Sequence, residues 1–168
     1  MAIRTFHHVA ISTGDMDKVF AFYRDLLGLE VNVDAEVDYR EPNPEGFPDS
    51  VMHPTAAWMK RCKTRFVNMQ LPDGSANVEV FQYLDPVGKD VEGQQLSQYD
   101  HRISHFGFQV DDIEAMSAKL KEQGVEFHWY PPADVGGGTL AVYVYDFEGN
   151  TVELIQKPEL SGLGKGKA

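Results

Sequence analysis

Residues 6–31 read FHHVAISTGDMDKVFAFYRDLLGLEV, and this stretch decides the fold, because residues 103–127, ISHFGFQVDDIEAMSAKLKEQGVEF, repeat its plan. Each copy opens with a strand pattern that carries a histidine, His8 in the first and His105 in the second. A turn, an apolar stripe at helical spacing and a glycine follow in both copies. The repeat predicts two similar units that pack together, since neither unit alone could bury its sheet well.

Local signals mark where the helix of each unit begins and ends. In the first unit, Asp15 follows a Thr-Gly turn and can cap a helix that ends at Gly28. In the second unit, Asp112 is the expected N-cap and Gly124 the closing residue. Glycine there permits the left-handed backbone that commonly ends a helix. The sequence therefore predicts one helix after the first strand of each unit.

The two halves also finish alike, with a turn followed by a strand that contains one glutamate. Residues 71–83, LPDGSANVEVFQY, contain Glu79, and residues 145–157, YDFEGNTVELIQK, contain Glu153. Asp-Gly in the first and Glu-Gly-Asn in the second provide the turn residues. Further strands are expected near residues 29–34 and 65–71 in the first half, and near 125–129 and 140–145 in the second.

Each half therefore reads as a strand, a helix and three strands, a βαβββ unit of the α+β class. We expect one domain over residues 1–168, made of a unit at 3–84, a linker at 85–101, a unit at 102–157 and a disordered tail at 158–168. Residues 34–63 interrupt the first unit as a long, Pro-rich insertion. Insertions of this length are often functional lids or disordered segments.

The duplicated histidines and glutamates predict a metal site. Side chains alternate between the faces of a strand, so each unit can present one imidazole and one carboxylate on a single sheet face. Imidazole suits Zn, Ni, Co and Fe, while carboxylate suits harder ions such as Mn and Mg. A single histidine or glutamate in a strand is usually structural. Its recurrence at matched points of both repeats is what favours a shared ligand role, since a buried carboxylate needs a cation nearby.

On these residues the chain resembles the vicinal oxygen chelate superfamily, which includes glyoxalase I, methylmalonyl-CoA epimerase, fosfomycin and bleomycin resistance proteins and extradiol dioxygenases. The resemblance covers roughly residues 3–157 and rests on HHVAIST, FYRDLLGLEV, NVEVFQY, SHFGFQVDD and DFEGNTVELIQKP. It implies two tandem βαβββ units that form a curved, incompletely closed mixed β-barrel around one divalent metal ion (Zn, Ni, Co, Mn or Fe). The implied metal ligands are His8, Glu79, His105 and Glu153.

The resemblance implies a glyoxalase-like isomerase, epimerase or lyase that acts through a metal-stabilised enediolate on a small substrate with vicinal oxygens. Glu153 or Glu79 is the expected catalytic base, with Glu153 favoured. Two alternatives stay open. An extradiol-type dioxygenase needs only a two-His, one-carboxylate set, and a non-catalytic binding or antibiotic-resistance protein needs no complete set. The presence of all four ligands favours catalysis, and Glu79 favours proton transfer over oxygen activation.

Net charge and composition restrict the kinds of molecule that the protein is expected to bind. Lys and Arg number 15 against 26 Asp and Glu, a net charge of -11 that disfavours nucleic acid and anionic membranes. A small-molecule substrate is therefore expected. Lys60, Arg61 and Arg65 are weak candidates for binding substrate anions. Phe81 is a weak candidate for an apolar wall.

The chain shows no sign of an oxidising compartment or of membrane insertion. Its single cysteine, Cys62, cannot form an intrachain disulfide, and no apolar run has the length of a signal peptide or a spanning helix. We therefore expect a cytoplasmic protein. A homodimer is usual in the superfamily that the chain resembles, although two units in one chain could complete a site in a monomer.

Overall fold

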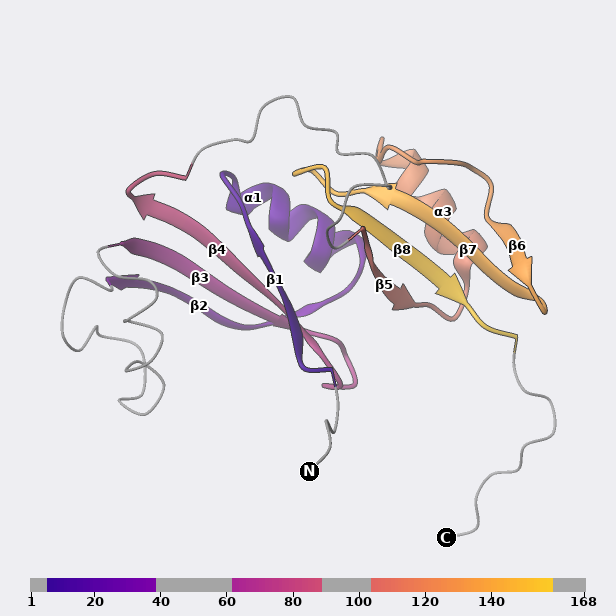
Figure 1. Ribbon diagram of the computed structural model, residues 1–168, viewed down its shortest axis with the longest axis horizontal. Coiled ribbons are helices and arrows are strands. Elements are labelled where there is room, and N and C mark those ends of the chain that lie inside the picture. The colour runs from indigo at the N-terminus through magenta and orange to yellow at the C-terminus, as the bar shows by residue number, and fades with distance from the viewer. Residues whose placement is uncertain (1–5, 39–61, 89–103, 159–168) are drawn as a thin grey trace, which may run out of the picture. The chain divides into compact units, whose positions relative to one another are not determined.

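The structure is a computed structural model that describes residues 6–38, 62–88 and 104–158 (Figure 1). The chain divides into two compact units, Met1–Gln94 and Gln95–Ala168. Each unit contains a strand, a helical segment and three further strands, in that order. The α+β class and the duplicated βαβββ plan predicted from the repeat are therefore confirmed.

The first unit is an open, mixed four-stranded sheet with one helical segment. Its strands are β1 (His8–Ser12), β2 (Glu30–Asp38), β3 (Lys63–Gln70) and β4 (Asn77–Asp85). They lie in the order β1-β4-β3-β2, with β1 parallel to β4 and the other pairs antiparallel. The first and last strands of the unit are therefore neighbours.

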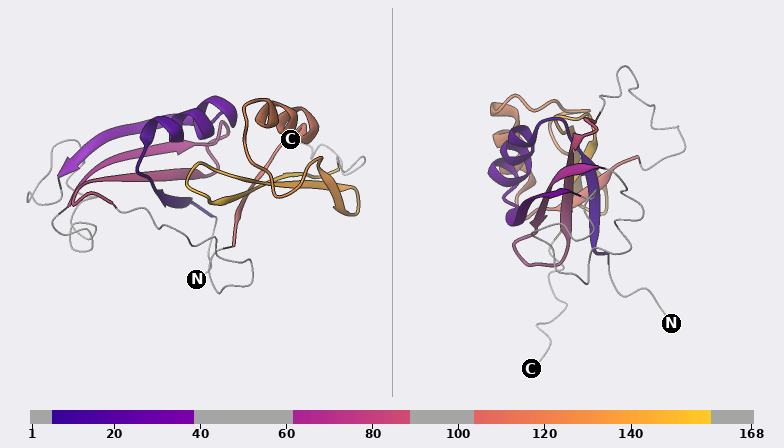
Figure 2. Two further views of the ribbon diagram at one scale, coloured as in Figure 1. Left: turned by 90° about the horizontal axis from the view of Figure 1, so that it is seen from above. Right: turned by 90° about the vertical axis from the view of Figure 1, so that its left-hand side faces the viewer.

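The second unit repeats this topology. Its elements are β5 (Phe106–Gln109), α3 (Ile113–Glu122), β6 (Ala133–Gly136), β7 (Thr139–Tyr145) and β8 (Thr151–Gln156). The sheet order is β5-β8-β7-β6, and β5 runs parallel to β8. Figure 1 shows the helix of each unit beside its own sheet, and Figure 2 shows the same elements from two further sides. None of the helices described is long and apolar enough to cross a membrane.

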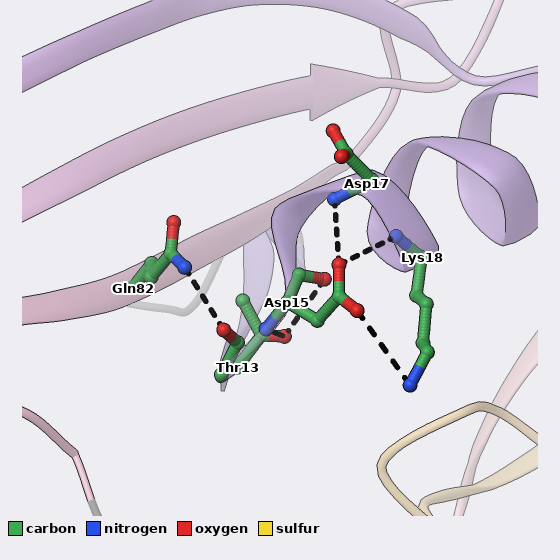
Figure 3. A network of polar contacts seen from close by, with 6 residues as sticks. Thr13, Asp15, Asp17, Lys18 and Gln82 are labelled. Carbon is green, nitrogen blue, oxygen red and sulfur yellow. Dashed lines mark hydrogen bonds and ion pairs between the residues drawn. The ribbon is translucent and has the colours of Figure 1, made fainter.

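The helix of the first unit begins where the sequence predicts, but it changes from an α-helix to a π-helix after one turn. It consists of α1 (Met16–Val19) followed by a π-helical segment, η1 (Phe20–Leu26). The Asp15 carboxylate accepts hydrogen bonds from the backbone N–H groups of Asp17 and Lys18, at 3.1 and 3.2 Å (Figure 3). Gly28 ends the segment with a φ of 84°. The π winding was not predicted, because the apolar spacing in this stretch resembles that of an α-helix.

In each unit, a side chain of the last strand forms a hydrogen bond with the backbone at the start of the helix. Gln82 of β4 donates from Nε2 to the backbone carbonyl of Gly14 at 2.9 Å, just before α1 (Figure 3). Gln156 of β8 accepts at Oε1 from the backbone N–H of Ile113 at 2.7 Å, at the first residue of α3. Asp112 caps α3 as predicted, and its carboxylate accepts from the Ala115 N–H at 2.9 Å.

The strand predicted near residues 125–129 is confirmed only in part. Phe127 forms a bridge with Val144, and two backbone hydrogen bonds of 2.9 Å, from the His128 N–H to the Tyr143 carbonyl and from the Tyr145 N–H to the Glu126 carbonyl, join the segment to β7. The longer pairing with β7 falls in β6, several residues later. Pro131 and Pro132 explain the displacement, because proline has no backbone N–H to continue a ladder of hydrogen bonds.

The three consecutive glycines form a tight hairpin between β6 and β7. Gly137 and Gly138 are the turn residues, with φ values of 65° and 79°. Positive φ at both central positions is what the favoured two-residue hairpin turn requires. Glycine adopts it without steric cost.

The insertion begins later than the sequence indicated. Residues 34–38, expected within it, complete β2 and pair with residues 63–67 of β3. Cys62, which falls within the predicted insertion, is buried beside Val37 and Phe66. Residues 39–61 lie outside the described residues, so the structure does not address their predicted role.

In each unit, the hydrophobic core lies on the face of the sheet that the helix covers. In the first unit the buried residues of that face are Val67, Met69, Val78 and Val80, and in the second unit they are Val142, Val144, Val152 and Leu154. The helices add Val19, Tyr23, Ile113 and Leu120, all fully buried. Because side chains alternate along a strand, the residues between these core positions face away from the helix. Glu79 and Glu153 are among them.

Candidate metal centre

A His–Glu pair lies on the face of the first sheet that its helix leaves uncovered. His8 begins β1, and Glu79 is in the neighbouring strand β4, where it pairs with Ala10. His8 is thus two residues before the register partner of Glu79, which places both side chains on one face. His8 Nε2 lies 3.8 Å from Glu79 Oε2.

The second unit builds the same pair in the same register. Glu153 of β8 pairs with Gly107 of β5, and His105 is again two residues before that partner. His105 Nε2 lies 3.5 Å from Glu153 Oε2. In each unit the glutamate is the more shielded member, with 21% and 17% of its side chain exposed, against 43% and 36% for the histidine. The structure therefore brings together His8 with Glu79 and His105 with Glu153.

The spacing inside each pair suits two ligands of one ion better than a hydrogen bond. Separations of 3.8 and 3.5 Å exceed the usual N–H···O range of about 2.7–3.2 Å. Metal bonds of about 2.0–2.2 Å to nitrogen and oxygen put two ligands about 3.4 Å apart in tetrahedral geometry. Within the described residues, no three His, Cys, Asp or Glu side chains form a metal-binding group. Each pair offers two of the four ligands that the sequence predicts.

Tyr143 distinguishes the second pair from the first. It pairs with Glu153 across β7 and β8, and its hydroxyl donates a hydrogen bond to the Glu153 carboxylate. Burial raises the pKa of the Tyr143 phenol, and the hydrogen bond and negative charge of Glu153 raise it further. The Tyr143 ring also meets the His105 ring edge-on, with centroids 5.0 Å apart. In the first unit the residue opposite Glu79 is Asn68.

The contact between Tyr143 and Glu153 was not predicted from the sequence. Tyr143 lies ten positions before Glu153, and only the antiparallel register of β7 and β8 brings the two together. The alternation in YDFEGNTVELIQK predicts which residues share a face within one strand, but it does not predict the cross-strand partner. Trp129 also packs on the Tyr143 ring, with centroids 4.8 Å apart.

The predicted substrate-binding residues have different placements. Phe81 shares the sheet face of Glu79 and packs on Phe66, with ring centroids 5.0 Å apart, so it provides apolar surface beside the first pair. Lys60 and Arg61 lie outside the described residues.

Arg65 lies on the opposite face, against the helix. Its guanidinium makes two hydrogen bonds of 2.8 Å to the Asp34 carboxylate, and its Cζ lies 5.5 Å from the centre of the Phe20 ring. The hydrogen bonds from Arg65 lower the pKa of Asp34. A substrate contact at the Glu79 face is therefore not supported for Arg65, because the alternation of β3 directs its side chain away from that face.

The absence of a side chain at Gly107 leaves room for the carboxylate of Glu153. A Cβ at this position would lie 3.1 Å from Glu153 Oε2, closer than ordinary contact. We predict that Gly107→Ala displaces the carboxylate and weakens metal binding about 10-fold, the lower end of what outer-shell changes cost. The measurement is a metal competition titration with a chromophoric chelator. The matched control is Ala10→Gly at the equivalent position of the first unit, and equal affinity in Gly107→Ala and wild type would contradict the prediction.

Comparison with known proteins agrees with this architecture. The family model of the Glyoxalase/Bleomycin resistance protein/Dioxygenase superfamily matches residues 5–154, and the chain belongs to this superfamily.

Individual relatives are distant. A lactoylglutathione lyase of Haemophilus influenzae is 24% identical over 160 residues, which cover 94% of this chain and 96% of that protein. A glyoxalase family protein of Bacillus cereus has a similar fold, with a TM-score of 0.73 at 17% identity over 93% of this chain and 95% of the other. A glyoxalase family protein from Enterococcus faecalis has a TM-score of 0.59 at 25% identity, over 92% of this chain and 99% of the other.

Proposed function

We propose that this protein is a divalent-metal-dependent, glyoxalase-like enzyme that moves a proton on a small substrate with vicinal oxygens, through an enediolate. Isomerase, epimerase and lyase reactions share this step. The observation that carries the proposal is the His–Glu pair built twice, in identical register and at ligand spacing. The similarity to a lactoylglutathione lyase supports the same reaction class.

In the proposed site, His8, Glu79, His105 and Glu153 hold one divalent ion. Two imidazoles and two carboxylates fit borderline ions such as Zn, Ni, Co, Mn or Fe. A bound ion supplies Lewis-acid stabilisation of the negative charge that develops on the substrate oxygens. Phe81 offers apolar surface on the Glu79 side, and the aromatic group of Tyr143 and Trp129 offers it beside Glu153.

Glu153 is the proposed base. A carboxylate that accepts a proton from the carbon beside the substrate carbonyl must stay oriented while its own contacts change. Tyr143 supports this role, because its hydroxyl gives Glu153 a second partner besides His105. The residue opposite Glu79 is the shorter Asn68, which carries no phenol. Glu79 is therefore assigned as a ligand, and Glu153 as both ligand and base.

The test measures hydrogen exchange at the substrate carbon. Protein stripped of metal and reloaded with Ni, Co, Zn, Mn or Fe is incubated in D₂O with 2-oxoaldehyde hemithioacetals or 2-substituted acyl-CoA thioesters. We expect deuterium uptake that requires metal and is lost in Glu153→Gln, with metal content checked in the same sample.

Three outcomes would contradict the proposal or part of it. Exchange near the wild-type rate in metal-loaded Glu153→Gln would remove Glu153 as the base. Absence of both metal binding and exchange would instead favour a small-molecule binder, and oxygen uptake with a catechol would favour a dioxygenase.

A further inference from the structure

The residue immediately before each ligand histidine contacts the ring nitrogen that faces away from the glutamate. His7 Nδ1 lies 2.9 Å from His8 Nδ1. Ser104 Oγ lies 2.9 Å from His105 Nδ1. Both contacts are within hydrogen-bond distance. The two units therefore share this contact although the residue types differ.

The protonation pattern of a neutral imidazole decides whether it can bind a metal. One ring nitrogen carries a hydrogen and the other carries a lone pair. Binding through Nε2, the nitrogen that faces the glutamate in both pairs, requires the hydrogen on Nδ1. An acceptor placed at Nδ1 stabilises that tautomer. The Ser104 hydroxyl oxygen has lone pairs, and His7 Nδ1 has one when the His7 hydrogen is on its own Nε2.

We infer that His7 and Ser104 are positioning residues that accept the Nδ1–H of His8 and His105 and so keep each Nε2 available for a metal. The inference rests on the proposed function for its purpose, but the tautomer it assigns can be measured without any metal. Strand alternation alone would direct the His7 side chain away from the face of His8. The His7 ring instead lies edge-on to His8, with centroids 5.1 Å apart.

The opposite hydrogen-bond direction is the competing arrangement. If the Ser104 hydroxyl or His7 Nδ1–H donated, the ligand histidine would carry its hydrogen on Nε2. That hydrogen would gain no good hydrogen bond from the glutamate of its pair, because Glu79 and Glu153 are 3.8 and 3.5 Å from the respective Nε2 atoms. The distances therefore favour hydrogen on Nδ1 in both units.

The test reads the tautomers directly, by ¹⁵N NMR of the imidazoles in metal-free protein at a pH where both rings are neutral. We expect wild-type His8 and His105 to show a protonated Nδ1. In Ser104→Ala and His7→Phe, the neighbouring ring should move toward the Nε2–H form. Ser104→Thr, which keeps the hydroxyl, should retain the wild-type pattern, and Ser75→Ala is the control for hydroxyl loss in a turn outside the site.

A metal competition titration provides the second readout. Ser104→Ala and His7→Phe should each weaken binding about 10-fold, within the range for outer-shell partners of a ligand histidine. A protonated Nε2 in the wild type would overturn the inference, as would wild-type tautomers and affinity in both variants. If the wild type shows the expected tautomers but binds no metal, the proposed function fails while the tautomer assignment stands.

Discussion

Replacing His105 by alanine is expected to abolish stoichiometric metal binding by the whole chain, although a complete His–Glu pair remains in the first unit. The reason is that, among the residues that the structure describes, neither unit by itself brings more than two potential ligands together. Outer-shell changes already cost about 10- to 100-fold in metal affinity, so loss of a direct ligand should cost about 100-fold or more. His8→Ala should have the same effect. Metal per chain, measured by elemental analysis after dialysis, checks both.

The same experiment distinguishes one shared ion from two separate ones. With one ion held by all four ligands, the wild type contains one metal per chain, and either histidine variant contains almost none. With one ion in each unit, the wild type contains two, and each variant retains one. The second result would contradict the proposed four-ligand site. Glu122→Gln, which removes an exposed carboxylate on α3, is the control for a change in charge alone.

Replacing the buried Leu120 by alanine is expected to lower the free energy of unfolding strongly. Leu120 is fully buried on α3, and that helix covers the core face of the second sheet. Truncating a buried leucine removes apolar contacts and leaves a cavity, which lowers the free energy of unfolding by about 2–5 kcal/mol. Urea unfolding followed by circular dichroism gives the measurement.

A control and a second readout keep this prediction specific. Glu122→Ala changes an exposed neighbour on the same helix and should alter the free energy of unfolding by less than about 0.5 kcal/mol. Because Leu120 faces the side of the sheet opposite Glu153, metal affinity below the unfolding transition should stay at the wild-type value. A Leu120→Ala protein as stable as Glu122→Ala would show that α3 does not anchor this core.

Local signals in the sequence predicted the elements well. Asp15 and Asp112 cap their helices, and Gly28 and Gly124 end them with left-handed backbone, because these preferences depend on neighbouring residues alone. The repeat predicted the shared topology of the two units. The structure adds the register of β1 and β4, which sets His8 beside Glu79.

Features that depend on distant partners were not predictable from one sequence. The hydrogen bond from Tyr143 to Glu153 requires the register of two strands, and the position of Arg65 against Phe20 requires the packing of η1. The shift of the longer pairing to β6, beyond Pro131 and Pro132, corresponds to a signal that the sequence does contain, since proline interrupts a ladder of hydrogen bonds.

The parallel pairing of first and last strands would couple the proposed metal binding to folding. In each unit the histidine comes with the first strand and the glutamate with the last, so the pair exists only when these two strands have paired. An ion that binds this folded arrangement and not the unfolded chain stabilises it by mass action. The melting temperature should therefore rise with the concentration of the correct metal, which makes thermal denaturation a means of identifying that metal without knowing the substrate.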